Sequence, residues 1–163
     1  MTKPIQMQLR VKGEPVPAGS YRPVPIRKQG IDVGSRVIND NPKTKGWQTL
    51  VTWSWWKHVR LVMGPDWFPW GGPVVLRAKF YFARPAAHYG RGKYAEKLRR
   101  DAPAEKVTKP DVSKLLRAIE DAMTGVVYKD DAQIVSATTS KEFGEPGCLI
   151  ELDLYEWSRW DAS

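Results

Sequence analysis

Residues 109–131 read Lys109-Pro110-Asp111-Val112-Ser113-Lys114-Leu115-Leu116-Arg117-Ala118-Ile119-Glu120-Asp121-Ala122-Met123-Thr124-Gly125, then Val126-Val127-Tyr128-Lys129-Asp130-Asp131. Pro110 and Asp111 are typical of a helix start, because proline lacks the N–H that a first turn leaves unpaired and aspartate can cap the amides. Gly125 is typical of a helix end, where a positive φ is often required. The stretch therefore predicts a helix between residues 111 and 125.

The predicted helix is amphipathic. One arc of its surface is apolar, with Val112, Leu115, Leu116, Ile119, Ala122 and Met123. The opposite arc is polar and mixes cations with carboxylates, with Ser113, Lys114, Arg117, Glu120 and Asp121. This spacing indicates a helix that lies on a core and presents a charged face.

Acidic residues frame this helix on both sides. Asp111 precedes it, and Asp130 and Asp131 open a segment, 132–135, that is typical of a strand. We expect the short return to bring Asp130 or Asp131 beside Asp111 at one end of the helix. Carboxylates gathered near basic side chains suit a divalent cation and a phosphate ester. On spacing alone a second interpretation stays open, in which Asp111 is a helix cap and the Asp-Asp pair is solvated.

The whole segment resembles the RusA family of Holliday-junction resolvases. The family pattern runs Lys-Pro-Asp-x-Asp-Asn-Leu-x-Lys, then Asp-Ala-Leu-x-Gly, then Asp-Asp-x-Gln-Ile/Val. It matches residues 109–117, 121–125 and 130–134 of this chain. Ser113 stands where the family has its second aspartate, Lys114 replaces the usual asparagine, and Arg117 aligns with the family's catalytic lysine.

The resemblance implies a Mg²⁺-dependent endonuclease that resolves four-way DNA junctions in recombination and repair by paired nicks from a symmetric homodimer. It implies that Asp111 and Asp131 are magnesium ligands, with Asp130 beside them and Ser113 as a weaker, neutral ligand. Arg117 would be the catalytic cation. Phage or prophage origin is also implied, since family members are common there.

DNA contacts are expected from the cations next to this segment, namely Lys114, Arg99, Arg100 and Lys109. Because Ser113 replaces a carboxylate, an alternative function is a module that binds branched or single-stranded DNA with weak or lost cleavage.

Length and composition set further bounds. The chain has 163 residues, enough for a single domain, which we place at 1–163. Its 26 Lys and Arg exceed its 18 Asp and Glu, which gives a net charge of +8 and suits a polyanionic partner, although many basic proteins bind no nucleic acid. Cys148 is the only cysteine, so no internal disulfide forms. The sequence contains neither a run of ~20 apolar residues nor a signal-peptide start, so we expect a protein of the bacterial host cytoplasm and no membrane partner.

The remaining sequence predicts an α/β fold, a mixed β-sheet with two main helices on one face. Strands are expected at 5–11, 74–82, 132–143 and 148–155, and the last two are expected to pair as a hairpin through the turn at 144–147. Residues 13–34 are rich in Pro and Gly and predict an extended basic hairpin, closed by a short strand at 36–39 and either solvated or in contact with DNA. The second helix is expected at 43–62.

Two segments invite functional interpretation. Residues 84–109 lack periodicity and hold eight cations against three carboxylates, which predicts a basic mobile loop that either stays solvated or clamps a DNA backbone. The tryptophans of the 43–62 helix are expected in the core or in a dimer contact rather than stacked on bases. The tail after Trp157 is expected to be frayed, with docking of Trp157 and Trp160 as the alternative.

Overall fold

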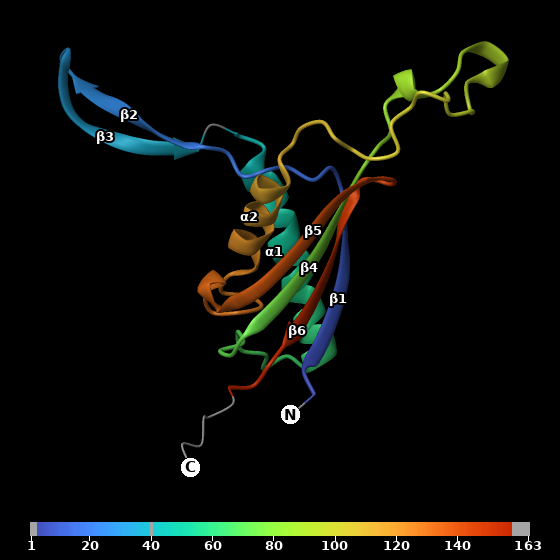
Figure 1. The fold of residues 1–163 in the computed structure, drawn as a ribbon. Helices are drawn as coiled ribbons and strands as arrows, with labels where there is room; N and C mark the ends of the chain where they lie inside the picture. Colours follow the sequence, from blue (N-terminus) through green and yellow to red (C-terminus); the bar gives the residue numbers. More distant parts are fainter. Residues whose placement is uncertain (1–2, 40, 158–163) are drawn as a thin grey trace.

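A four-stranded sheet with two helices on one face forms the body of the protein (Figure 1). The computed structural model describes residues 3–39 and 41–157. The sheet order is β1 (Ile5–Lys12), β6 (Gly147–Leu154), β4 (Val74–Phe82) and β5 (Ile134–Phe143). β6 is antiparallel to both β1 and β4, whereas β5 is parallel to β4. The predicted mixed α/β fold is confirmed.

The helices α1 (Thr44–Met63) and α2 (Val112–Met123) pack on each other and on the sheet. Alternate strand residues face the helices because side chains along a strand point to opposite faces. The core formed in this way includes Val11, Leu76, Phe80, Ile150 and Leu152 from the strands, Val51, Trp55 and Val59 from α1, and Leu115, Ile119 and Met123 from α2. The apolar arc predicted for α2 is the face that it buries, so its charged arc faces outward.

The expected hairpin of the last two strands is wrong. β4 lies between β5 and β6, so the two strands never pair. The short link from Phe143 to Gly147 crosses the end of β4, and the Gly144 N–H donates to the Phe82 carbonyl at 2.9 Å. A Cβ at Gly147 would lie 2.7 Å from the Val11 carbonyl oxygen, so glycine is required where the chain enters β6. In addition, residues 131–133 form the 3₁₀ helix η3 rather than the start of the strand.

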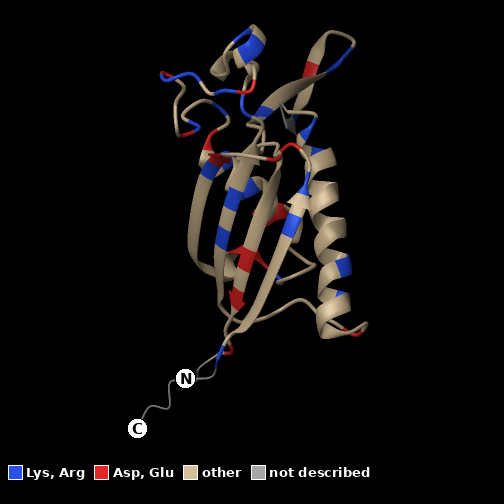
Figure 2. Cartoon of the chain, turned by 90° about the vertical axis from the view of Figure 1, so that its right-hand side faces the viewer, with Lys and Arg blue, Asp and Glu red and all other residues tan. Residues whose placement is uncertain are grey.

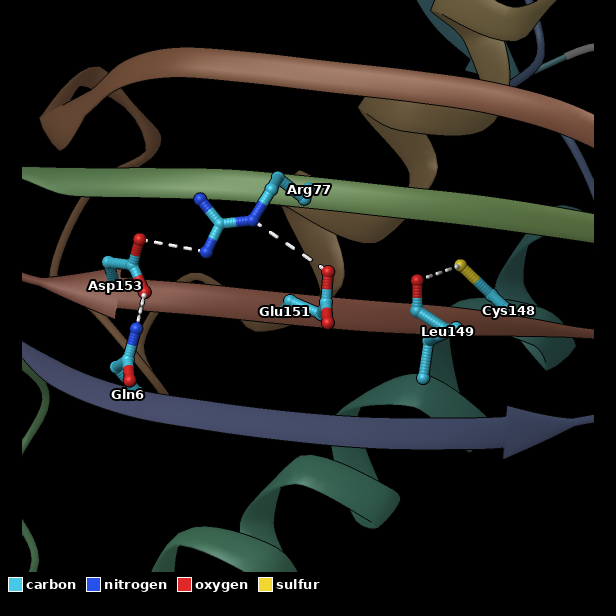
Figure 3. A network of polar contacts seen from close by, with 6 residues as sticks. All are labelled: Gln6, Arg77, Cys148, Leu149, Glu151 and Asp153. Atoms are coloured by element: carbon cyan, nitrogen blue, oxygen red, sulfur yellow. Dashed lines mark hydrogen bonds and ion pairs between the residues drawn. The ribbon is translucent and has the colours of Figure 1, made fainter.

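The face of the sheet opposite the helices is polar (Figure 3). Arg77 donates to the Asp153 carboxylate at 2.8 Å, and its Nε lies 3.7 Å from Glu151. Gln6 donates to the other Asp153 oxygen at 3.1 Å. Asp153 is buried in this network, which satisfies its carboxylate. This explains the buried acid as a structural residue of the sheet.

Two segments project from one end of the body (Figure 1). The first is the predicted hairpin, confirmed as β2 (Tyr21–Lys28) paired with β3 (Ile31–Asn39). The second is segment 84–109, which contains the 3₁₀ helices η1 (Ala86–His88) and η2 (Gly92–Tyr94) and a bridge between Tyr89 and Leu98. We call these the hairpin arm (21–39) and the loop arm (84–109). Mobility of the loop arm stays a prediction.

The tryptophans divide between core and surface. Trp47 and Trp55 are buried, but Trp53 is 56% exposed and lies edge-on to Trp56, 5.3 Å between ring centroids. Trp157 is docked, since its indole donates to the Gly71 carbonyl at 2.9 Å, while Trp160 and the rest of the tail after Trp157 lie outside the described residues.

Two further expectations concern the thiol and the membrane. Cys148 is buried beneath the helices, and burial raises the pKa of its thiol. Neither α1 nor any other helix in the described part of the chain has the length and apolar character of a membrane span.

Candidate functional site

Asp111 occupies the position immediately before α2, as predicted, yet its side chain makes no capping hydrogen bond. The segment that presents it is held from β5, since Lys141 donates to the carbonyls of Thr108 and Pro110, each at 2.9 Å. Asp111 is exposed. The capping interpretation therefore fails for its side chain, and the carboxylate faces solvent at the positive end of the helix dipole.

Cations surround this end of α2. Lys114 donates to the Ser20 hydroxyl at 3.2 Å, which ties the first turn to the base of the hairpin arm. Lys106 donates to the Lys109 carbonyl at 2.9 Å. Partial burial lowers the pKa of Lys106, and the charge of Lys141 lowers it further. A depression of about 350 Å³ beside these residues is lined by Glu14, Pro15, Val16, Pro17, Asn41, Lys43, Phe82, Lys106, Lys109 and Pro110. Ser113 is exposed on the same turn.

Asp130 and Asp131 lie at the opposite end of α2 and have different surroundings. Asp130 caps η3, because its carboxylate accepts from the Ala132 amide at 2.8 Å and its own amide donates to the Gln133 side chain at 2.9 Å. Gln133 in turn donates to the Trp70 and Gly72 carbonyls. Asp130 is therefore a structural cap. Asp131 is exposed in the first turn of η3.

The last turn of α2 adds two carboxylates next to Asp131. Burial raises the pKa of Glu120, and the charges of Asp131 and Asp121 raise it further. Burial also raises the pKa of Asp121, against the opposing effect of Arg117. Glu120, Asp121 and Asp131 thus form an anionic cluster at the C-terminal end of the helix. Sequence reasoning did not select Glu120, although a carboxylate at the negative end of a helix dipole is an unfavourable placement that could have identified it.

A groove of about 500 Å³ separates α1 from α2 and contains Arg117. It is lined by Lys45, Gln48, Thr49, Thr52, Trp53, Arg117, Asp121 and Ala122. The Gln48 amide lies 3.4 Å from the Asp121 carboxylate, and Thr52 donates to the Ala122 carbonyl at 2.8 Å. Arg117 therefore stands midway along α2, between the exposed Asp111 and the anionic cluster.

The expectation that Asp130 or Asp131 returns beside Asp111 is wrong. α2 has 12 residues, about 18 Å at the rise of an α-helix, and it separates the two positions. β5 runs back along the helix, with Lys141 beside Pro110 and Ile134 directly after η3. Among residues 3–39 and 41–157, no three His, Cys, Asp or Glu side chains are grouped to hold a metal ion. Within one chain, the predicted ligands do not fit one Mg²⁺.

The remaining candidate DNA contacts lie on the loop arm, which the exposed Asp111 adjoins in sequence. Arg99 forms an ion pair with Asp101 at 2.6 Å, and Arg100 and Lys109 are exposed. The hydrogen bond from Arg99 lowers the pKa of Asp101. Figure 2 shows Lys and Arg gathered on both arms, at the end of the body where α2 begins.

The α/β domain carries exposed carboxylates on one helix and cationic arms beside the start of that helix. The cationic arms give it a surface suited to a polyanion. The chain belongs to the RusA endodeoxyribonuclease family, whose model matches residues 14–153. It is also similar to the uncharacterized protein YqaN of Bacillus subtilis (strain 168), with 34% identity over 74 residues. That alignment covers 45% of this chain and about half, 51%, of the relative's length.

Proposed function

We propose that this protein is a Mg²⁺-dependent endonuclease that resolves four-way DNA junctions by paired nicks, acting as a homodimer on DNA in a bacterial cytoplasm. Membership of the RusA family supports nuclease activity. The observation that carries the proposal is Asp111, an exposed carboxylate at the start of α2 that makes no capping bond. Such a side chain adds nothing to its own helix cap and is available for chemistry.

A second copy of the chain would complete the metal site. Asp111 and Asp131 lie at opposite ends of α2. If a two-fold axis pairs the α2 helices of two protomers in antiparallel fashion, Asp111 of each comes beside the partner's Asp131. Along the exposed arc, the cations Lys114 and Arg117 precede the carboxylates Glu120 and Asp121, so antiparallel pairing also sets opposite charges against each other.

The roles of the side chains follow from this arrangement. Asp111 and the partner's Asp131 would hold the ion, with Ser113 as a neutral ligand on the first turn. When bound, Mg²⁺ polarises the scissile phosphate and lowers the pKa of the attacking water. Arg117 neutralises the charge that develops on the phosphate in the transition state, and Lys114 supports it. Asp130 keeps its structural role as the cap of η3.

The DNA is held by charge and shape. Lys109, Arg99 and Arg100 contact phosphates from the loop arm, next to Asp111 in the sequence. Because each phosphate contact releases counterions, junction affinity falls steeply with salt. Two symmetric sites in one dimer account for cuts in two opposing strands of a junction, which one site cannot make.

Cleavage of a labelled synthetic junction tests the proposal. The wild-type protein cuts in Mg²⁺ and not in EDTA, while Asp111→Asn binds the junction without cutting it. Asp130→Ser, which keeps a capping oxygen, is the matched control and cuts. Binding by the wild type without any cleavage would refute the nuclease assignment.

Ser113 favours a second candidate, a junction-binding module with weakened cleavage. A hydroxyl donates less charge to a hard cation than a carboxylate does. Restoring the acid in Ser113→Asp separates the two: a large gain in rate identifies a weakened enzyme, and an unchanged rate shows that the hydroxyl suffices.

A further inference from the structure

We propose that the hairpin arm recognises the branch point of the DNA, with its apolar tip inserted at the open centre of the junction and its cations on the flanking phosphates. This inference rests on the proposed function, since it assigns a role toward the same substrate. The tip consists of Ile26, Ile31 and Val33, which are 40%, 68% and 54% exposed.

The hairpin arm has little support from the body. Its two strands contact each other extensively, but no comparable contact joins either strand to the described helices or to the main sheet. Arg22, Pro23 and all of residues 25–36 are exposed. A solitary two-stranded hairpin is marginally stable in water. A binding partner would therefore add to the stability of this arm.

One face of the arm carries both the cations and the apolar side chains. Alternation along β2 puts Arg22, Val24, Ile26 and Lys28 on the same side. The register adds their cross-strand partners, Arg36 opposite Val24 and Ile31 opposite Lys28, and it shifts between Ile26 and Arg27, so Val33 has no partner in the register. On the other face, Arg27 is neutralised by Asp32 at 2.8 Å. The arm therefore presents Ile26 and Ile31 together with cations on one face.

The distribution of charge favours nucleic acid over a second copy of the chain. The hairpin arm has four cations and one carboxylate, and the loop arm has eight and three. Their net charges of +3 and +5 account for the whole +8 of the protein, so the rest of the chain is neutral. An arm with this net positive charge is expected to bind a polyanion strongly.

The backbone of β2 argues against strand addition by a protein partner. Pro23 and Pro25 lack N–H groups and occupy alternate positions of β2. The hydrogen bonds between β2 and β3 therefore remain, while the outer edge of β2 lacks N–H donors at these two positions. Prolines and charges on an edge prevent another strand from pairing there.

The arm has dimensions and chemistry that suit branched DNA. A two-stranded ribbon fits a DNA groove. Apolar side chains such as isoleucine insert between base steps and kink or unstack them. At the open centre of a four-way junction, the innermost base pairs have no stacking neighbour on one side. Insertion of a side chain there therefore costs less free energy than insertion into a continuous duplex. The arm would therefore favour junctions over linear DNA.

Junctions that contain 2-aminopurine beside the branch point test this inference. Binding in EDTA, without cleavage, is expected to raise the fluorescence of the unstacked base with the wild type. The variant Ile26→Ser/Ile31→Ser should lose this change and about tenfold in junction affinity, the size of a lost base contact, while its affinity for linear duplex stays within about twofold. Arg22→Gln/Lys28→Gln should reduce the slope of log K against log salt by about 1.8.

The matched control is Arg27→Gln/Asp32→Asn, which keeps the net charge and alters the opposite face. It should behave as the wild type in each measurement. A tip variant that unstacks the base as well as the wild type would overturn the inference. So would a tip variant that dissociates a dimer, measured by light scattering, without a change in junction preference.

Failure of the hairpin inference is distinguishable from failure of the proposed function. A wild type that unstacks the branch point but never cuts it refutes the nuclease and retains the role of the arm. A tip variant that cuts and unstacks normally refutes the role of the arm and retains the nuclease.

Discussion

The decisive prediction concerns complementation between two inactive variants. Asp111→Asn and Asp131→Asn each remove one proposed ligand and should be inactive as pure proteins. From Asp111 to Glu120, which belongs to the anionic cluster, the helix rises about 14 Å. Two oxygens that bind one Mg²⁺ at about 2.1 Å each lie at most about 4.2 Å apart. One chain therefore does not supply both proposed ligands, and in the proposed dimer each site takes one from each protomer.

Mixed dimers of the two variants should recover activity. In such a dimer one site carries both substitutions and the other carries none. Random mixing makes about half of the dimers mixed, so about a quarter of all sites are intact. A labelled junction should be nicked at about a quarter of the wild-type rate, as measured on a denaturing gel. Paired cuts should be absent, since no mixed dimer has two intact sites.

The same number of substitutions in a different arrangement gives the control. Wild type mixed with the double variant Asp111→Asn/Asp131→Asn places one substitution in each site of the mixed dimer, which should be inactive. A site shared between protomers would be refuted by the opposite pattern. In that pattern, the mixture of wild type and double variant is more active than its wild-type homodimers alone explain, and the mixture of the two single variants is inactive.

Three further predictions follow from the fold. Glu120→Gln should stabilise the protein by about 0.5 kcal/mol at pH 7. Because folding raises the pKa of Glu120, the stability of the wild type should fall as pH rises from the unfolded-state pKa through the folded-state pKa. Thermal melts at several pH values should show that the advantage of the variant vanishes below that window. Gly147→Ala should lose about 2 kcal/mol in urea denaturation, because its Cβ meets the Val11 carbonyl, and an unchanged midpoint would contradict this close approach of β6 to β1. Asp130→Ala should lose about 1 kcal/mol of stability as a lost cap and retain cleavage per folded molecule, whereas Asp131→Ala should lose cleavage with little change in melting temperature.

Local patterns predicted most of the fold. The alternation of Val74–Phe82 matched β4, and the apolar arc of α2 matched its buried face, since both follow from the geometry of a single element. The pairing of β5 with β6 was predicted wrongly, because residues 144–147 look like a hairpin turn. Only the packing of β4 between the two strands decides that the link crosses over instead.

The sequence named candidate residues for the site but did not predict how they are arranged in space. Asp111 and Asp131 were named from the motif, which does not specify where its residues lie relative to one another in the folded chain. The link after α2 folds on itself, with the Gly125 amide donating to the Tyr128 carbonyl at 2.7 Å, so β5 starts where the helix ends. Glu120 was missed because its significance depends on the neighbours that this turn brings to it.

The buried thiol has a practical consequence for studying the arms. Cys148 is the only cysteine, and it is enclosed and held in its protonated form. A cysteine introduced at the tip of each arm would thus be the only site open to maleimide dyes or spin labels in the native protein. The separation of the two arms, free and on a junction, becomes directly measurable without first removing a native cysteine.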